Sequence, residues 1–349
     1  MRIPEKLLRD AAREILIGLG ETREGAEIAA EILVSSDMRG VSTHGVNLLR
    51  QISKRKDVGM ITIPTRVDIV SEDATTALLD GNDGLGQVAG YRAMRLSIEK
   101  AQRSGIAMVG LRNTNNIGAL GYYTSTAASS GDVIALCMTN GNPSVAPYGS
   151  ADPFFGTNPV SFGIPLAGGI PIVLDMSSSV VARGKIRLAA LSGESIPSGW
   201  ACDEKGEPTT DPNKALKGSL LPLGGPKGSG LAMVIDILAG LLMGSSYGLK
   251  LKSFHELEGP TGVGASFIAI DIARFMDPGL FAEHVRAYAD EIKNLRKQPG
   301  ATAILLPGEV ESMKEERSRI SGIEVPEAVA KAIDEILIKS GSAIRIAVE

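Results

Sequence analysis

The spacing of apolar residues predicts helices near both ends of the chain. Residues 5–19 place apolar side chains three or four positions apart, so that they share one helical face. A second helix is predicted to begin near Thr22, a residue type that caps helices, and to stop at Gly40. Helical patterns return at residues 278–297 and 326–341. The two ends therefore share a pattern that is typical of a helical domain.

The middle of the chain changes to short runs of β-branched and apolar residues. These runs predict strands at residues 66–70, 76–80, 106–112, 133–140 and 171–176. A helical pattern at residues 87–105 lies between two of them, and a further short strand is predicted at residues 302–306. The alternation of strands and helices indicates an α/β fold.

These patterns predict two domains. Residues 1–65 and 296–349 are expected to form one helical domain from both termini, and residues 66–295 are expected to form an α/β domain inserted between them. The Gly-, Pro- and Ser-rich stretches at residues 141–159 and 192–199 are interpreted as loops within the inserted domain.

Composition and charge exclude several kinds of partner. The net charge is −4 and the Lys and Arg residues are scattered, which argues against a nucleic-acid partner. The most apolar window, residues 230–244, is too short to cross a membrane, and the N-terminus lacks the apolar segment of a signal peptide. We therefore expect a cytoplasmic protein without a membrane partner. Cys137 and Cys202 form no metal-ligand pattern and are interpreted as structural, so no metal site is predicted.

Two glycine-rich segments are candidates for a phosphate-binding site. In residues 80–94 the glycine spacing departs from the dinucleotide fingerprint, so a plain turn before a helix is the alternative interpretation. In residues 224–240, four glycines and Lys227 precede an apolar helix whose N-terminus would favour an anion. A tight turn with a solvated lysine explains the same pattern.

Seven ordered motifs carry a resemblance to a known family: RGVSTHG (39–45), NTNNIGALGYY (113–123), FGTNP (155–159), VLDMSSSVVARGKI (173–186), EPTTDP (207–212), GGPKGSGLAM (224–233) and LPGE (306–309). Together they resemble the malate/L-lactate dehydrogenase-type oxidoreductases, which include sulfolactate and ureidoglycolate dehydrogenases and ketimine reductases. The resemblance implies a mixed-sheet nucleotide-binding core of non-Rossmann topology. It also implies a nicotinamide cofactor (NAD, with NADP as the alternative), a small-molecule substrate and a homodimer.

Within these motifs, His44 resembles the family's proton donor. Hydride transfer to a carbonyl leaves an alkoxide, and an imidazole with an ordinary pKa of about 6.5 supplies the proton near neutral pH. By the same resemblance, Thr43 would orient the ring. Lys185 would hold an anionic substrate group or polarise the carbonyl, and a solvated lysine is the alternative. His255 and His284 lie outside the motifs and are expected to face solvent.

The resemblance also implies substrate and cofactor contacts. Thr157 and Asn158 match positions that touch the substrate and the nicotinamide region. Asp175, Met176 and Ser177 match the segment near the adenosine, where a carboxylate would favour NAD by repelling the 2′-phosphate of NADP. A buried capping aspartate is the alternative for Asp175. The remaining cofactor contacts fall on Asn116, Ile117, Gly118, Ala119, Leu120, Lys227, Gly228, Pro307, Gly308 and Glu309.

Three positions depart from the family pattern. Leu48 stands where an arginine usually clamps the substrate carboxylate, Ile52 replaces a usual tyrosine and Asn116 a usual histidine. Either another cation, such as Arg39, Lys185 or Arg183, holds the carboxylate, or the substrate is not an ordinary 2-oxo acid. The predicted function is the reduction of a small 2-oxo acid to the 2-hydroxy acid. A cyclic ketimine reductase and a nucleotide-binding homologue without turnover are the alternatives.

Overall fold

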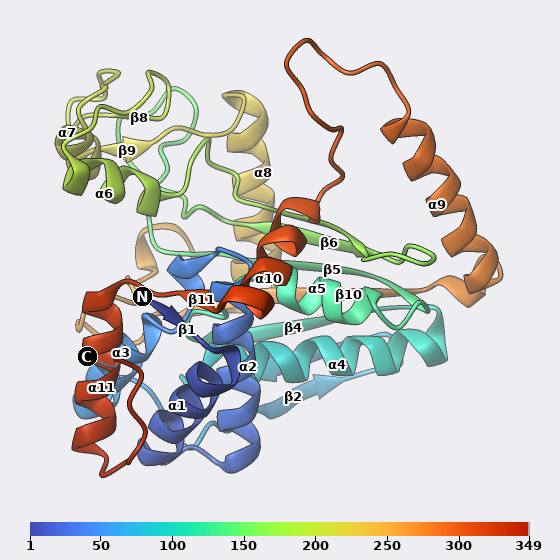
Figure 1. Ribbon diagram of the computed structural model, residues 1–349. Coiled ribbons are helices and arrows are strands. Elements are labelled where there is room, and N and C mark those ends of the chain that lie inside the picture. The colour runs from blue at the N-terminus through green and yellow to red at the C-terminus, as the bar shows by residue number, and fades with distance from the viewer. Residues whose placement is uncertain (348–349) are drawn as a thin grey trace.

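A seven-stranded mixed sheet forms the centre of the computed structural model, which describes residues 1–347 (Figure 1). In order across the sheet, its strands are β2 (Asp68–Glu72), β3 (Thr76–Asp80), β4 (Ile106–Thr114), β10 (Val263–Asp271), β5 (Val133–Thr139), β6 (Val160–Ile164) and β7 (Ile172–Met176). Strands β3 and β4 run parallel, and the other neighbouring strands of this sheet pair antiparallel. The predicted α/β fold with a mixed sheet is thereby confirmed.

Helices cover both faces of this sheet. On one face lie α4 (Gly86–Ser104) and α5 (Leu120–Ala128), and on the other lie α8 (Pro226–Asp236) and the π-helical turn η2 (Ile237–Leu241). Strand β10 packs against helices on both faces of the sheet, because Phe267 belongs to the apolar cluster under α4 and Ile268 packs against the cluster under η2. The centre of the sheet is therefore buried on both sides.

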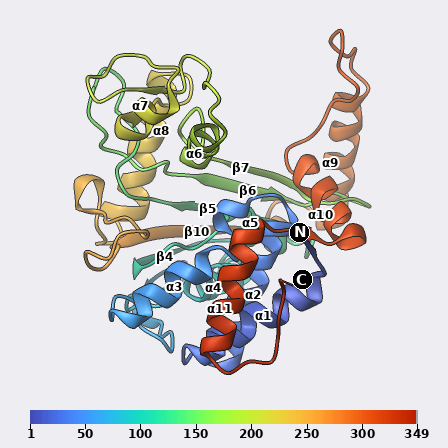
Figure 2. The ribbon, with the colours of Figure 1, turned by 60° about the vertical axis from the view of Figure 1, so that its left-hand side comes forward.

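Helices from both ends of the chain share one apolar core. They are α1 (Glu5–Gly18), α2 (Arg23–Met38), α3 (Leu48–Asp57) and α11 (Glu327–Lys339), and they lie next to one another in Figure 2. The short strands β1 (Arg2–Ile3) and β11 (Ile323–Glu324) pair beside them. Thr22 caps α2 as predicted, because its hydroxyl accepts a 3.0 Å hydrogen bond from the N–H of Gly25. The predicted domain boundaries near residues 65 and 296 stay a prediction.

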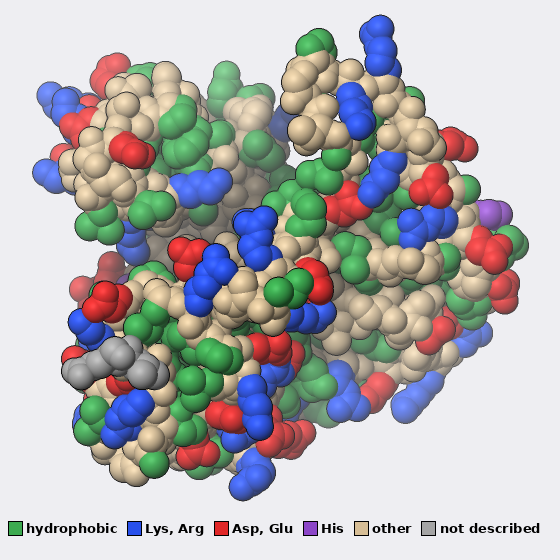
Figure 3. Space-filling model, in the orientation of Figure 1, with side chains coloured by type: hydrophobic (Ala, Val, Ile, Leu, Met, Phe, Trp, Pro, Cys, Tyr) green, Lys and Arg blue, Asp and Glu red, His purple; other side chains and the backbone are tan. Residues whose placement is uncertain are grey.

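Two parts of the chain stand apart from these layers. One is a lobe with its own small apolar core, made of α6 (Arg183–Ser192), β8 (Ala201–Cys202), α7 (Pro212–Lys217) and β9 (Ser219–Leu220). Figure 3 shows a hollow in the surface between this lobe and the rest of the molecule. The other is α9 (Pro278–Lys293), which projects outward before the chain returns to α10 (Glu309–Ser321). The short helices η1 (Ser42–His44), η3 (Gly248–Lys250) and η4 (Ile272–Arg274) complete the fold.

The structure corrects the predicted elements at several points. The strand predicted at residues 302–306 is wrong, because these residues form no ladder. The next residue, Pro307, meets the sheet edge, where its carbonyl accepts a 3.0 Å hydrogen bond from the Val173 N–H. The helix predicted over 278–297 ends at Lys293. Strands β6 and β10 were not predicted. None of the helices in residues 1–347 combines the length and the apolar character that a membrane crossing requires.

Candidate active site

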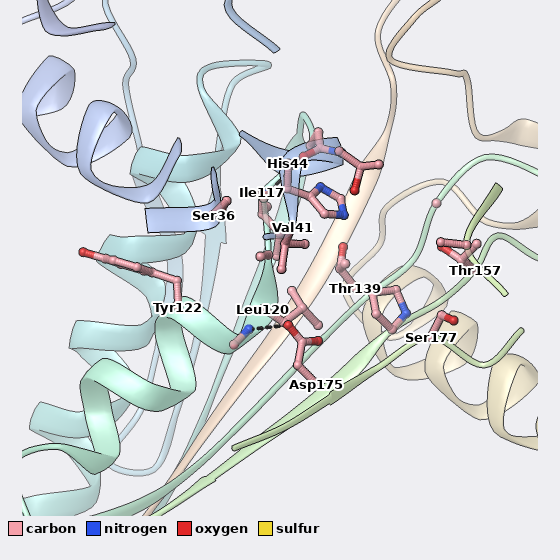
Figure 4. A pocket seen from close by; sticks show the side chains of 18 of the residues that line it. Ser36, Val41, His44, Ile117, Leu120, Tyr122, Thr139, Thr157, Asp175 and Ser177 are labelled. Carbon is pink, nitrogen blue, oxygen red and sulfur yellow. Dashed lines mark hydrogen bonds between the residues drawn. The ribbon is translucent and has the colours of Figure 1, made fainter. Parts of the chain in front are cut away.

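One cavity of about 540 Å³ opens where η1, the start of α5 and the edge of the sheet meet (Figure 4). This volume lies in the range of about 300–1,000 Å³ that small-molecule sites occupy. Several residues predicted to act in a site line this cavity: Thr43, His44, Asn116, Ile117, Gly118, Ala119, Leu120, Thr157, Asp175, Met176, Ser177, Pro307 and Gly308. Residues that are far apart in the sequence therefore meet around one space.

His44 projects from η1 into the wall of this cavity. Burial lowers the pKa of His44 below its ordinary value, contact with the Asn116 side chain raises it in part, and the charge of His255 lowers it further. Its Nδ1 atom is buried and has no hydrogen-bond partner in residues 1–347, and the residue lines the cavity. The imidazole is therefore neutral at rest and available for proton transfer.

Asp37 supports the turn that carries His44, although it was not among the predicted site residues. It lies in the last turn of α2, where its Oδ2 accepts a 2.7 Å hydrogen bond from the N–H of Val46. Gly45 packs directly against this carboxylate, so a Cβ at Gly45 would overlap it. Burial raises the pKa of Asp37 to about 7. The available signal was an acidic residue near a helix C-terminus, where the helix dipole disfavours a negative charge.

Asp175 reaches the same cavity from β7. Its Oδ2 accepts a 2.7 Å hydrogen bond from the N–H of Gly121 in the first turn of α5, drawn as a dashed line in Figure 4. The side chain is exposed to the open cavity, while protein packs around it on its other sides. This burial raises the pKa of Asp175 to about 6, while the Gly121 hydrogen bond and the charge of Arg39 lower it. Asp175 is therefore a carboxylate that titrates near neutral pH.

The segment before α5 is shaped by close backbone contacts. Gly118 has a φ of +84°, a conformation that favours glycine, and its N–H donates to Asn116 Oδ1 at 2.9 Å. Gly86, at the start of α4, lies so close to the carbonyl of Asn116 that a Cβ there would overlap it. The hydroxyl of Tyr123 donates to the carbonyl of Ile117. These contacts hold the segment rigidly against the cavity.

Several predicted site residues lie outside the cavity lining. Asn158 is buried, and its amide donates to the Ala232 carbonyl at 3.0 Å while its oxygen accepts from the Gly141 N–H at 3.2 Å. Glu309 pairs with Lys293 and accepts from the N–H of Leu306. The others are Lys185, exposed in the first turn of α6, and Lys227 and Gly228 at the start of α8. Their roles toward a substrate or cofactor stay predictions.

Other residues line the cavity without having been assigned there by a motif, among them Lys252, Phe254, Thr261 and Thr139. Arg39, considered above as a substitute cation, also lines it. The other two histidines, His255 and His284, are both exposed. His255 nevertheless lies close enough to His44 for its charge to lower the pKa of His44. In residues 1–347, no group of three or more His, Cys, Asp or Glu side chains is arranged to hold a metal ion.

Solved structures and curated sequences share this architecture over nearly the whole chain. The structure of sulfolactate dehydrogenase from Methanocaldococcus jannaschii is 36% identical, with a TM-score of 0.93, covering 99% of this chain and 98% of that one. The structure of Δ1-piperideine-2-carboxylate reductase from Pseudomonas syringae is 30% identical, with a TM-score of 0.86, covering 96% and 99%. Malate/(S)-sulfolactate dehydrogenase of Methanothermus fervidus is 39% identical over 323 residues, 93% of each chain.

These similarities define the protein as a nicotinamide-dependent oxidoreductase of the dehydrogenase class. A sequence model of the malate/L-lactate dehydrogenase family matches residues 3–334, and the chain belongs to this family. The resemblance carried by the seven motifs is thereby confirmed. The names of further relatives specify NAD(+) in one case and NADP(+) in another, so the family contains both preferences.

Proposed function

We propose that the protein reduces the carbonyl of a small 2-oxo acid to the 2-hydroxy acid, with His44 as the proton donor. The observation that carries this proposal is that His44 lines the same cavity as Asn116 and Asp175, with a buried Nδ1 that no other group of residues 1–347 engages. The names of the relatives, which act on malate or sulfolactate, support the substrate class.

The cavity has the features that a nicotinamide nucleotide requires. Its walls enclose a volume of about 540 Å³. Gly118 and Gly121 keep side chains off the start of α5, and a Cβ at Gly121 would stand 3.0 Å from Asp175 Oδ2. The cofactor would lie along residues 116–120, against the 307–308 turn, and when bound its nicotinamide supplies the hydride. We propose that this core has a non-Rossmann topology, and its one parallel and five antiparallel strand pairs support that proposal, since the doubly wound dinucleotide fold is mostly parallel.

His44 moves the proton in this proposal. Its lowered pKa keeps the imidazole neutral when the site is empty, and a bound anionic substrate raises that pKa and favours the protonated form. Protonated Nε2 then donates to the developing alkoxide, which lowers the barrier to reduction. Thr43, next to the ring in η1, is proposed to orient it. The backbone of Lys185 lies close to this turn, because the preceding residue, Gly184, packs against the Thr43 methyl group.

Assembly as a homodimer is part of the same proposal. Five apolar side chains that are 43–59% exposed follow one another along α8 and η2: Met233, Val234, Ile237, Leu241 and Leu242. Exposed apolar surfaces of this kind mark contacts between subunits. We expect light scattering to give twice the chain mass of 36.5 kDa, and a mass near one chain at micromolar concentration would overturn the dimer.

A cyclic ketimine reductase is the second candidate, supported by the likeness to the piperideine-2-carboxylate reductase structure. The deciding experiment follows NADH or NADPH oxidation at 340 nm with pyruvate, oxaloacetate, sulfopyruvate and the cyclic imines pyrroline- and piperideine-2-carboxylate. Turnover of the imines alone would reject 2-oxo acid reduction. Cofactor binding without turnover of any of them would indicate a nucleotide-binding homologue.

A further inference from the structure

The wall of the cavity near His44 is completed by residues 252–261, which we call the 252–261 segment. Its two ends are joined by a 3.1 Å hydrogen bond from the Lys252 N–H to the Thr261 carbonyl. The hydroxyl of Thr261 donates to the Thr114 carbonyl at 2.8 Å, which anchors the segment two residues before Asn116. Lys252, Phe254 and Thr261 all line the cavity. The segment is therefore a closed loop whose base lines the same cavity as His44.

Arg55 of α3 holds this segment from within the protein. Its side chain is fully buried, and its guanidinium donates to the carbonyls of Glu256 and Gly259, each at 2.7 Å. The same group lies 5.3 Å from the centre of the Phe254 ring, a distance that favours a cation–π contact. No carboxylate forms an ion pair with Arg55 within residues 1–347. A buried charge is thus satisfied mainly by the backbone of one loop.

Lys252 is the lining cation that remains available to a ligand. Two cationic side chains, Arg39 and Lys252, are among the residues that line the cavity. Arg39 donates to the Ser125 hydroxyl at 3.3 Å and lies 3.9 Å from Glu315. Lys252 is exposed, and within residues 1–347 its ammonium makes neither a hydrogen bond nor an ion pair. An anion that enters this cavity therefore meets in Lys252 an ammonium that is not paired with a carboxylate.

We propose that Lys252 binds the anionic group of the substrate and that Arg55 is a positioning residue, which acts by holding the 252–261 segment. This inference rests on the proposed function, because it assigns the carboxylate contact of the same site. An ammonium is a compact charge without the fixed fork of a guanidinium, so it donates hydrogen bonds to carboxylate and sulfonate oxygens in several orientations. The substrate class that follows is a small carbonyl or imine compound with an oxyanion next to the reacting carbon.

The main test compares a charged substrate with its neutral ester. In Lys252→Met the apolar stem stays and the charge is lost, so KM for pyruvate is expected to rise about 10- to 100-fold, since a charge-assisted hydrogen bond disappears. KM for methyl pyruvate, and the affinity for NADH, should not change. Lys252→Arg should restore most of the loss. Lys250→Met is the matched control, because Lys250 contacts Tyr247 outside the cavity lining and should leave KM unchanged.

Arg55 is tested through its dependence on Lys252. Arg55→Lys is expected to raise KM for pyruvate about tenfold and to spare methyl pyruvate. Combined with Lys252→Met it should add no further rise, because both changes remove the same contact. A merely structural role would add its effect to that of Lys252→Met and would change KM for both substrates equally. Should Arg55→Lys fail to fold, the Lys252 comparison decides the anion contact by itself.

Failure of this inference is distinguishable from failure of the proposed function. If wild-type enzyme reduces pyruvate and Lys252→Met has the same KM, the Lys252 assignment is wrong and the proposed function stands. If wild-type enzyme reduces no 2-oxo acid, the proposed function fails, and Lys252 is then tested by calorimetric binding of oxamate to the enzyme with NADH. Weaker oxamate binding by Lys252→Met supports the inference, whereas equal binding, or no binding by wild type, overturns it.

Discussion

Replacement of Gly45 by alanine is expected to disturb the turn that carries His44. Gly45 has φ −91° and ψ −159°, an extended conformation that any residue adopts, so its backbone does not require glycine. The surroundings do require glycine, because an added Cβ would overlap the carboxylate of Asp37. Either Asp37 or the turn must then move, and both alternatives displace the 2.7 Å hydrogen bond between Asp37 Oδ2 and the Val46 N–H.

The magnitude follows from these two contacts. Overpacking a close contact costs about 1–3 kcal/mol, and weakening a hydrogen bond to a charged group adds up to about 1.5–3 kcal/mol. Because relaxation relieves part of each, we expect Gly45→Ala to lower the free energy of unfolding by about 2–4 kcal/mol. A shift of about 1 Å at His44 would also lower kcat by about 10- to 100-fold.

Urea unfolding followed by circular dichroism, together with initial rates, measures both effects. Gly230→Ala is the control, since Gly230 lies in α8 and a Cβ there meets nothing within 4 Å. In an Asp37→Ala background the carboxylate that the new Cβ would overlap is absent, so Gly45→Ala should then lower the free energy of unfolding by less than about 1 kcal/mol. If Gly45→Ala is as stable and active as Gly230→Ala, or costs the same with and without Asp37, the steric argument is refuted.

Three further predictions concern the pH profile, the core and the cofactor. Burial lowers the pKa of His44, so kcat/KM for reduction should fall as pH rises through a value below 6.5. His44→Gln should remove this pH dependence and lower turnover by roughly 10²- to 10⁴-fold, which pH–rate profiles of both enzymes will test. Leu48→Arg should destabilise the protein by about 3–5 kcal/mol in urea unfolding and leave KM for pyruvate no better, because Leu48 is 2% exposed. NADH should be preferred over NADPH by at least about tenfold through Asp175; equal initial rates would reject this assignment and direct attention to Arg39.

Elements whose signal lies within their own residues were predictable. The amphipathic faces of α1 and α11 and the cap at Thr22 depend on side chains a few positions apart, so the helices were found to within a few residues. Strand β3 was predicted with its observed bounds, Thr76–Asp80, because its apolar residues form a short run between turn residues.

Elements defined by distant partners were not predictable in this way. β10 lies between β4 and β5, and its neighbours come from more than a hundred residues earlier in the chain. Because both faces of β10 are buried, its residues do not alternate between apolar and polar. Residues 302–306 have the composition of a strand but lie where no partner strand offers a ladder. Composition therefore predicted a strand that long-range pairing does not provide.

The candidate site divides along the same line. His44, the 116–120 segment and Asp175 belong to local motifs, and the cavity brings them together. Asp37 carries a weak local signal, its place near a helix C-terminus, but its contact with Gly45 and Val46 appears only in the folded structure. Glu309 matched a motif, yet its carboxylate pairs with Lys293. Pro307 and Gly308 of the same motif line the cavity, whereas Glu309 is not among the lining residues.

The face of α3 explains why the substrate anchor could not be predicted from motifs. Leu48, Ile52 and Arg55 are spaced at positions i, i+4 and i+7, so they share one side of the helix. Leu48 and Ile52 belong to an apolar cluster that includes Phe254, and Arg55 donates to the backbone of the same loop. Apolar side chains at 48 and 52 thus allow the 252–261 segment to pack against α3, with its base beside His44. The motif shows only that positions 48 and 52 are apolar, whereas the fold shows that they pack against a loop that carries the cation Lys252.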